Sequence, residues 1–137
     1  MVATVKNPNV VDACTSDNRL ATLSSLSDRL DKCQKSLSDY LDTKRSAFPR
    51  FFFISDDELL SVLGSSDPTS ICIHLLKLFD NVKNISFGRN NKVVESMSSV
   101  EKEGFDFVTV VPVEGAVEMW MTLCEEEMHV SLRDITK

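Results

Sequence analysis

The run from Tyr40 to Leu60 constrains the fold of this chain more than any other segment. It carries four phenylalanines within six positions, around a proline, Pro49. Aromatic side chains bury much apolar area when a chain folds, so these rings must anchor a core. Proline also fixes its own φ and keeps Phe48 out of the α region. The sequence therefore predicts that the preceding helix ends near residues 46–47 and that a rigid corner follows.

A strand and a new helix are expected after this corner. Residues 51–54 form a continuous apolar run of high strand propensity, which predicts a short strand covered on both faces. Ser55-Asp56-Asp57-Glu58 has the spacing of a capping box, which predicts a helix that begins there and ends at Gly64. We expect the corner to be a structural joint in the core, formed by Tyr40, Phe48, Pro49, Phe51, Phe53 and Trp120.

A long amphipathic helix is predicted before the corner, from about Asn18 to Ser46. Apolar residues recur in alternating steps of three and four from Leu23 to Tyr40, which is a heptad pattern. A helix of this length extends roughly 40 Å at 1.5 Å per residue. The pattern is typical of a coiled-coil dimer or of a helix in a bundle. The bundle is favoured because only about three heptads are sustained.

Shorter elements follow the corner. Asp67-Pro68 predicts the N-cap and first residue of a helix that ends near Asn81. Strand patterns over 85–87, 92–98 and 105–111 predict a small antiparallel sheet, and a final helix is expected from Gly115 to about Asp134.

The sequence thus predicts a single α+β domain that is predominantly helical, an elongated helix bundle with a small antiparallel sheet or hairpin insertion. Four parts are expected: an N-terminal segment over 1–18, a helical part over 19–83 that includes the strand 51–54, a β-hairpin part over 84–112 and a C-terminal helix over 113–137.

Composition and charge exclude several function classes. The 137 residues hold 15 Lys and Arg against 21 Asp and Glu, a formal net charge of -6. Nucleic-acid binders need a positive surplus, so no nucleic-acid role is indicated. The sequence has no signal-peptide pattern and no apolar stretch as long as a membrane span, so we expect an intracellular, soluble protein without membrane contact. The four cysteines lack metal or redox spacing and are expected to be reduced core thiols.

No catalytic or cofactor motif is present in the sequence. There is no glycine-rich nucleotide loop, and His74 and His129 have no partner at metal-ligand spacing. The run Glu125–Glu127 is interpreted as a solvated helix face, because adjacent residues point to different sides of a helix. We therefore predict no catalytic, cofactor-binding or metal-ligating residue.

The cations Lys44, Arg45 and Arg50 have two possible roles. They fall where the C-terminal end of a helix favours positive charge, so a structural role is preferred. The alternative is a docking surface for an acidic partner.

Several segments together resemble the linker region of dynein heavy chains. The resemblance spans roughly residues 7–137. It is carried by residues 30–41, Lys44-Arg45, Phe48-Pro49-Arg50-Phe51-Phe52-Phe53, residues 55–60, Phe79-Asp80-Asn81-Val82, residues 97–101 and Val117-Glu118-Met119-Trp120-Met121. Residues 51–57 and 64–68 look more like axonemal than cytoplasmic dyneins. One position departs from the family's Glu-Gly-Glu hairpin turn, because Lys102 stands in place of the glycine, and this predicts a turn of different type.

This resemblance implies a mechanical role without catalysis. The dynein linker is a mostly helical rod that arches over a ring of AAA+ modules and changes its bend as the ring hydrolyses ATP, which drives minus-end-directed movement on microtubules. The implied partners are the AAA+ ring and neighbouring linker segments, with other dynein subunits and microtubules bound through the whole heavy chain. ATP and magnesium are implied for the parent motor and no cofactor for this segment. Lys44, Arg45 and Arg50 are then candidate contacts with the ring.

The implied location is the cytoplasm and cytoskeleton, with the axoneme of a cilium or flagellum favoured. The alternative function is a helical adaptor that binds another helix through the Leu23–Tyr40 stripe. An enzyme is the least favoured class.

Overall fold

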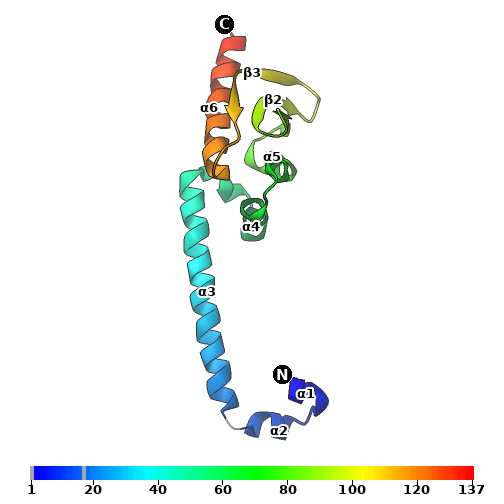
Figure 1. The fold of residues 1–137 in the computed structure, drawn as a ribbon, viewed down its shortest axis with the longest axis vertical. Helices are drawn as coiled ribbons and strands as arrows, with labels where there is room; N and C mark the ends of the chain where they lie inside the picture. The colour runs from blue at the N-terminus through cyan, green and yellow to red at the C-terminus, as the bar shows by residue number, and fades with distance from the viewer. Residues whose placement is uncertain (1, 17) are drawn as a thin grey trace. The chain divides into compact units, whose positions relative to one another are not determined.

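The computed structural model describes residues 2–16 and 18–137. The chain forms two compact units, Met1–Tyr40 and Leu41–Lys137. The predicted class, a predominantly helical α+β fold with a small antiparallel sheet, is confirmed (Figure 1). In chain order the elements are α1 (Val2–Lys6), α2 (Val10–Thr15), α3 (Arg19–Ala47), the 3₁₀ helix η1 (Pro49–Phe53), α4 (Asp56–Gly64), the 3₁₀ helix η2 (Pro68–His74), α5 (Leu75–Leu78), β1 (Val82–Gly88), β2 (Val93–Ser99), β3 (Gly104–Pro112) and α6 (Val117–Ile135).

The first unit consists of α1, α2 and the greater part of α3. Asn9 caps α2 by accepting a hydrogen bond from the backbone N–H of Val11 (3.0 Å). The guanidinium of Arg19 donates to the carbonyl of Ala13 (2.9 Å), which ties the first residue of α3 to α2. The long helix predicted from Asn18 to Ser46 is confirmed to within one residue at each end.

Residues 51–54 do not form the predicted strand. They belong to η1 and its C-terminal cap, because Phe51 N donates to Phe48 O (3.0 Å) and Ile54 N donates to Phe51 O (3.4 Å). Proline suits the first turn of a helix, where its missing N–H has no intrahelical acceptor. Phe48 keeps the extended conformation expected before proline, with φ −133° and ψ 94°.

The 3₁₀ geometry decides which aromatic rings are buried. Three residues per turn place Phe48, Phe51 and Ile54 on the same side of η1, and all three are buried. Phe52 and Phe53 lie on the other sides, and Phe53 is 65% exposed. The prediction that Phe53 packs in the core is therefore wrong, because it assumed a strand covered on both faces.

The helices after the corner begin with the predicted caps. Ser55 Oγ accepts from the N–H of Glu58 (3.3 Å) and the Glu58 carboxylate accepts from the N–H of Ser55 (3.0 Å), so the capping box is confirmed, as is the helix end at Gly64. Asp67 caps the next helix as predicted. That helix is split into η2 and α5 and ends before Asn81, whose φ of 64° turns the chain into β1.

The sheet has the order β1-β2-β3 and both pairs are antiparallel. The pairing of β2 with β3 is interrupted between Val94 and Ser96, where β3 carries extra residues and forms a bulge. Helix α6 packs along β3 (Figure 1). At the bulge Ser131 accepts from the N–H of Val108 (3.0 Å) and Glu127 accepts from the N–H of Thr109 (2.9 Å). Side chains of α6 thus satisfy donors that an edge strand leaves unpaired.

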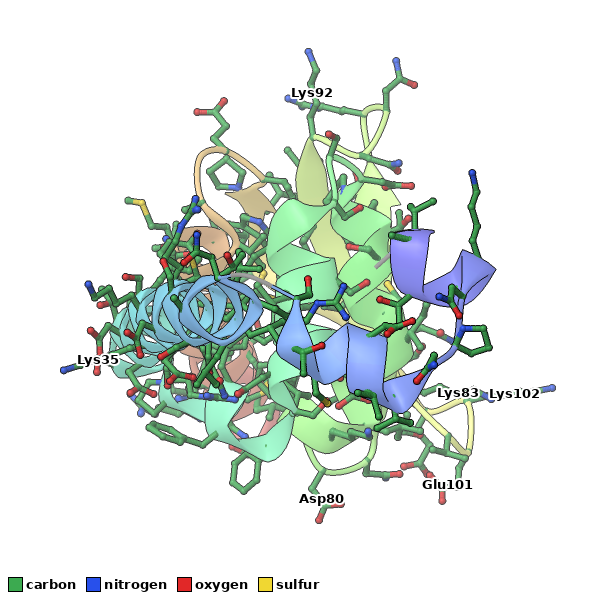
Figure 2. All side chains as sticks on the ribbon, turned by 90° about the horizontal axis from the view of Figure 1, so that it is seen from below. Lys35, Asp80, Lys83, Lys92, Glu101 and Lys102 are labelled. Carbon is green, nitrogen blue, oxygen red and sulfur yellow. The ribbon has the colours of Figure 1, made fainter. Side chains whose placement is uncertain are left out.

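The two sheet turns lie at opposite ends, with Lys92 beside one turn and Glu101 and Lys102 in the other (Figure 2). Lys102 has a φ of 67°, in the left-handed region that glycine enters without strain. Lys92 is not among the residues with positive φ. The predicted change of turn type relative to the family stays a prediction.

The core of the second unit contains side chains from the end of α3 and from η1, α4, η2, α5, the three strands and α6. Cys124 lies in it, and burial raises the pKa of its thiol to about 12. Cys14 and Cys33 belong to the first unit, in whose described part no residue is buried, and both are exposed. The prediction of core thiols is therefore wrong for these two. The buried cluster comprises Leu41, Phe48, Phe51, Ile54, Leu59, Val62, Ile71, Leu75, Leu78, Phe79, Ile85, Val94, Met97, Phe107, Val111, Trp120, Met121 and Cys124.

Candidate functional site

Within the second unit, two aromatic rings and three basic residues fasten the last turns of α3 to the elements that follow them. This region, called the joint, comprises Leu41–Ile54 and the side chains of α4, α5 and α6 that these residues contact. The Phe48 ring lies edge-to-face on Phe51, with centroids 4.9 Å apart, and 6.3 Å from the Phe79 ring at the end of α5. The predicted aromatic corner therefore packs on the end of α5.

The first polar contact of the joint is an ion pair between α3 and α6. Lys44 Nζ donates to Glu118 Oε1, and the two side chains are only 20% and 11% exposed. The other carboxylate oxygen of Glu118 is buried and has no hydrogen-bond partner among the described residues. Removing two charges from water offsets much of their attraction, but a buried charge left without its partner costs several kcal/mol. Breaking this pair should therefore cost more than the intact pair adds to net stability.

The second contact links α3 to the far end of η1. The guanidinium of Arg45 donates to the carbonyl of Ile54 (3.3 Å) and to the carboxylate of Asp56 (2.7 Å). It also reaches the carbonyl of Phe51 at 3.5 Å. A planar guanidinium offers several donors in fixed directions, so the Arg45 side chain can bind the Ile54 carbonyl and the Asp56 carboxylate at the same time.

The third contact joins three elements through Arg50 of η1. Its Nε donates to Glu125 of α6 (2.8 Å), its Nη1 donates to the carbonyl of Leu78 in α5 (3.0 Å), and its guanidinium carbon lies 4.6 Å from the centroid of the Phe79 ring. Stacking on an aromatic face and a charge-assisted hydrogen bond are both available to arginine and less so to lysine. Arg50 is therefore the residue through which η1, α5 and α6 are held together.

The interpretation of Glu125–Glu127 as a solvated face is wrong for two of the three residues. Glu125 is paired with Arg50, and Glu127 accepts from β3 and from Ser131. Glu126 alone of the three is exposed. Adjacent residues do point to different sides of the helix, as expected, but two of those sides face protein.

The six residues predicted for the aromatic joint have different surroundings. Phe48 and Phe51 contact each other, and Trp120 is buried in α6 with its ring 6.3 Å from that of Phe87. Pro49 is exposed but begins η1. Tyr40 belongs to the first unit and is half-exposed.

Sequence reasoning missed the acidic partners in the joint. Glu118 and Glu125 are seven positions apart, which is two helical turns, so they share one face of α6. The spacing shows that the two glutamates share a face, but a sequence does not say which distant element that face contacts, so no local pattern identifies Lys44 and Arg50 as their partners. The contacts made by Lys44, Arg45 and Arg50 support the structural role over the docking role, and their contact with a ring stays a prediction.

A second polar cluster surrounds Glu58 at the start of α4. Lys77 Nζ lies 2.5 Å from the Glu58 carboxylate and His74 Nδ1 lies 3.6 Å from it. The hydrogen bond from Lys77, followed by that from the backbone N–H of Ser55, lowers the pKa of Glu58 from 4.5 to about 2. The ion pair between Glu58 and Lys77 thus ties α4 to α5.

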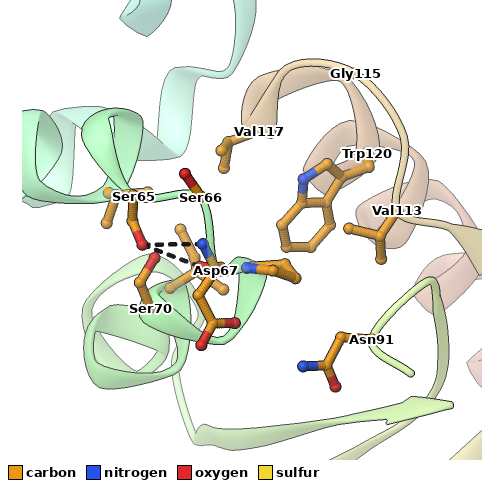
Figure 3. Close-up of a pocket in the computed structure, with 12 residues that line it drawn as sticks. Ser65, Ser66, Asp67, Ser70, Asn91, Val113, Gly115, Val117 and Trp120 are labelled. Atoms are coloured by element: carbon orange, nitrogen blue, oxygen red, sulfur yellow. Dashed lines mark hydrogen bonds between the residues drawn. The ribbon is translucent and has the colours of Figure 1, made fainter.

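A small pocket of about 200 Å³ lies between η2 and the start of α6 (Figure 3). Ser65 Oγ accepts from the N–H of Asp67 (3.2 Å) and donates to its carbonyl (3.3 Å), so these polar groups are used within the loop. Hydrogen bonds from Thr69 lower the pKa of the Asp67 carboxyl. The twelve lining residues include no cation to bind a phosphate. Within residues 2–16 and 18–137, three or more His, Cys, Asp or Glu side chains do not come together in a way that suits a metal ion.

No helix within residues 2–16 and 18–137 combines the length and the apolar character that crossing a membrane demands.

Comparison with known proteins defines the class. The family model described as dynein heavy chain, N-terminal region 2, matches residues 1–137. The chain therefore belongs to the dynein heavy chain family.

Three relatives illustrate how similar the chain is to individual dynein heavy chains. The chain is 64% identical over 134 residues to the Dynein-1-alpha heavy chain of the flagellar inner arm I1 complex of Chlamydomonas reinhardtii, which covers 98% of this chain. It is 49% identical over 140 residues to human Dynein axonemal heavy chain 10, covering 100% of this chain. Identity to human Cytoplasmic dynein 2 heavy chain 1 is 40% over 132 residues, covering 88% of this chain. Among these three, the flagellar and axonemal chains are the more similar, as the sequence predicts.

The chain spans 3% of the length of each of these three relatives.

Proposed function

We propose that this chain is a mechanical, non-catalytic segment of the linker of an axonemal dynein heavy chain. In this proposal the segment is part of a lever that couples ATP hydrolysis in the AAA+ ring to minus-end-directed movement along microtubules. The observation that carries it is the joint, where Lys44, Arg45 and Arg50 fasten the end of a long helix to α4, α5 and α6. A lever must transmit force without local unfolding, and a helix end held by ion pairs over a close-packed aromatic core suits that task.

The proposal also assigns a location and partners. The heavy chain acts in the cytoskeleton, in the axoneme of a cilium or flagellum, with microtubules and other dynein subunits. This segment meets neighbouring linker segments and the ring. ATP and magnesium bind in the ring, outside this segment.

The experiment is a comparison of Arg50→Ala with wild type in the complete heavy chain. Microtubule-stimulated ATP hydrolysis and microtubule sliding velocity are measured on the same preparations. Because Arg50 holds three elements of the lever and lies outside the proposed ring, hydrolysis should be retained while sliding slows. Arg133→Ala is the matched control, since Arg133 is an exposed arginine in the last turn of α6, and it should change neither rate.

Two results would contradict the proposal. One is an Arg50→Ala heavy chain with unchanged sliding velocity. The other is a parallel loss of hydrolysis and sliding, which would place this segment in the catalytic cycle itself.

A further inference from the structure

Two adjacent phenylalanines on η1 are exposed to solvent. Phe52 is 66% exposed and Phe53 is 65% exposed. The three-residue turn of η1 directs Phe51 into the core and leaves these two rings outside it. A single exposed apolar side chain is common on protein surfaces, whereas two neighbouring aromatic rings form a surface of the kind that is enriched in protein interfaces.

The surroundings of the two rings present negative charge to solvent. The guanidinium carbon of Arg45 lies 5.8 Å from the centroid of the Phe52 ring. The same guanidinium lies 2.7 Å from the carboxylate of Asp56 and 3.9 Å from that of Asp42. The Arg45 side chain is only 13% exposed, whereas those of Asp56 and Asp42 are 62% and 65% exposed. The surface therefore presents both carboxylates to solvent and keeps the cation beneath them. These four exposed side chains, Phe52, Phe53, Asp42 and Asp56, form the aromatic-acidic patch.

An arginine side chain suits the chemistry of the aromatic-acidic patch. Its guanidinium can stack on an aromatic ring and donate hydrogen bonds to a carboxylate at the same time. The fold already uses this combination at Arg50, which lies 4.6 Å from the centroid of the Phe79 ring and donates to Glu125 (2.8 Å). The carboxylates would repel the phosphates of a nucleic acid or of an anionic membrane. Charge complementarity therefore selects a basic polypeptide segment.

The composition of the patch also indicates where that segment comes from. Permanent interfaces resemble a protein core and are largely apolar. Interfaces between partners that also exist apart place aromatic residues inside a polar rim, as the patch does. We infer that the aromatic-acidic patch binds a segment of another polypeptide through an arginine that contacts an exposed ring and the carboxylate of Asp42 or Asp56. This inference goes beyond the proposed lever, because it assigns the patch to a partner outside the heavy chain.

The test is photo-crosslinking in the dynein complex that contains the complete heavy chain and its bound subunits. p-Benzoylphenylalanine replaces Phe53, because it keeps an aromatic ring at a position outside the core. The same replacement at Phe52 is a second, independent probe. Neither replacement should change the midpoint of urea unfolding of this chain. After irradiation, peptide mapping should show each position joined to a polypeptide other than the heavy chain, in a peptide that carries an arginine beside the attachment point.

Two charge variants separate this contact from capture of any nearby protein. Asp42→Asn removes one carboxylate of the patch while Arg45 keeps its closer partner, Asp56. It should lower the crosslink yield by about two- to fivefold, which is the effect of losing one exposed ion pair. Asp134→Asn is the matched control, because Asp134 is also an exposed aspartate (63%) in a loose i,i+3 pair, 3.7 Å from Lys137, and it should leave the yield unchanged.

Four results would overturn the inference: no product at either position, a product within the heavy chain, a product with a peptide that lacks arginine, or equal yields from Asp42→Asn and Asp134→Asn. None of these outcomes depends on the sliding velocity of Arg50→Ala, so failure of this inference and failure of the proposed lever are separable.

Discussion

Replacing Phe51 by alanine should destabilise the second unit by about 3–5 kcal/mol. The side chain is fully buried and its ring lies 4.9 Å from that of Phe48 in an edge-to-face arrangement. Burial of a phenylalanine side chain contributes roughly 1.5–3 kcal/mol, and the aromatic pair adds about 0.5–1.5 kcal/mol. The cavity left between η1 and the core accounts for the remainder, because the aromatic neighbours cannot close fully around alanine.

The assay is urea unfolding followed by the fluorescence of Trp120. This is the only tryptophan of the chain, and it is buried in the second unit, so its signal reports on that unit. Phe53→Ala is the matched control, since the same substitution two residues along η1 removes an exposed ring and should change stability by no more than about 0.5 kcal/mol. If Phe51→Ala does not fold, Phe51→Leu should still show a loss of about 1.5 kcal/mol. The reasoning fails if the Phe51 and Phe53 variants unfold at the same urea concentration.

Three further predictions concern charge and backbone conformation, each measured by the same unfolding assay. Lys44→Ala should lower the free energy of unfolding by about 2–4 kcal/mol, because it leaves Glu118 buried without its partner. The double substitution Lys44→Met with Glu118→Leu should lower it by less. Equal losses would contradict the role of the pair. The pKa of Glu58 is lowered to about 2, so its contribution is fully present above pH 4.5 and is lost as the pH falls towards 2. The stability difference between wild type and Glu58→Gln should shrink over that range, and a constant difference would refute the assignment. Lys102→Gly should raise stability by up to about 1 kcal/mol by relieving a positive φ, whereas Lys92→Gly should give no gain, and equal gains would show that strain is not the cause.

Local signals in the sequence predicted most of the helix and strand positions. Pro49 marked the end of α3, Ser55 and Glu58 marked the start of α4, and Asp67 marked the start of η2. Each signal works through atoms within a few residues of one another, such as a missing N–H or a side chain that caps a turn. Such contacts can be predicted from the sequence because the partners are close along the chain.

The features that the sequence did not reveal depend on partners far apart in the chain. A continuous apolar run such as 51–54 suits a strand or one buried side of a short helix, and only the surrounding core decides between them. The core takes Phe51 and leaves Phe53 in solvent. The pairing of Arg50 with Glu125 joins residues that lie 75 positions apart, so no local pattern could identify it.

The resistance of the joint to force is the property that the proposed lever requires. The chain can be held in an optical trap by the exposed thiol of Cys33, with Cys14 changed to serine and a second handle attached after Lys137. The wild-type second unit should rupture in one cooperative step, and Arg50→Ala should lower the rupture force because η1 is released from α5 and α6. Rupture at the same force in both chains would contradict the account.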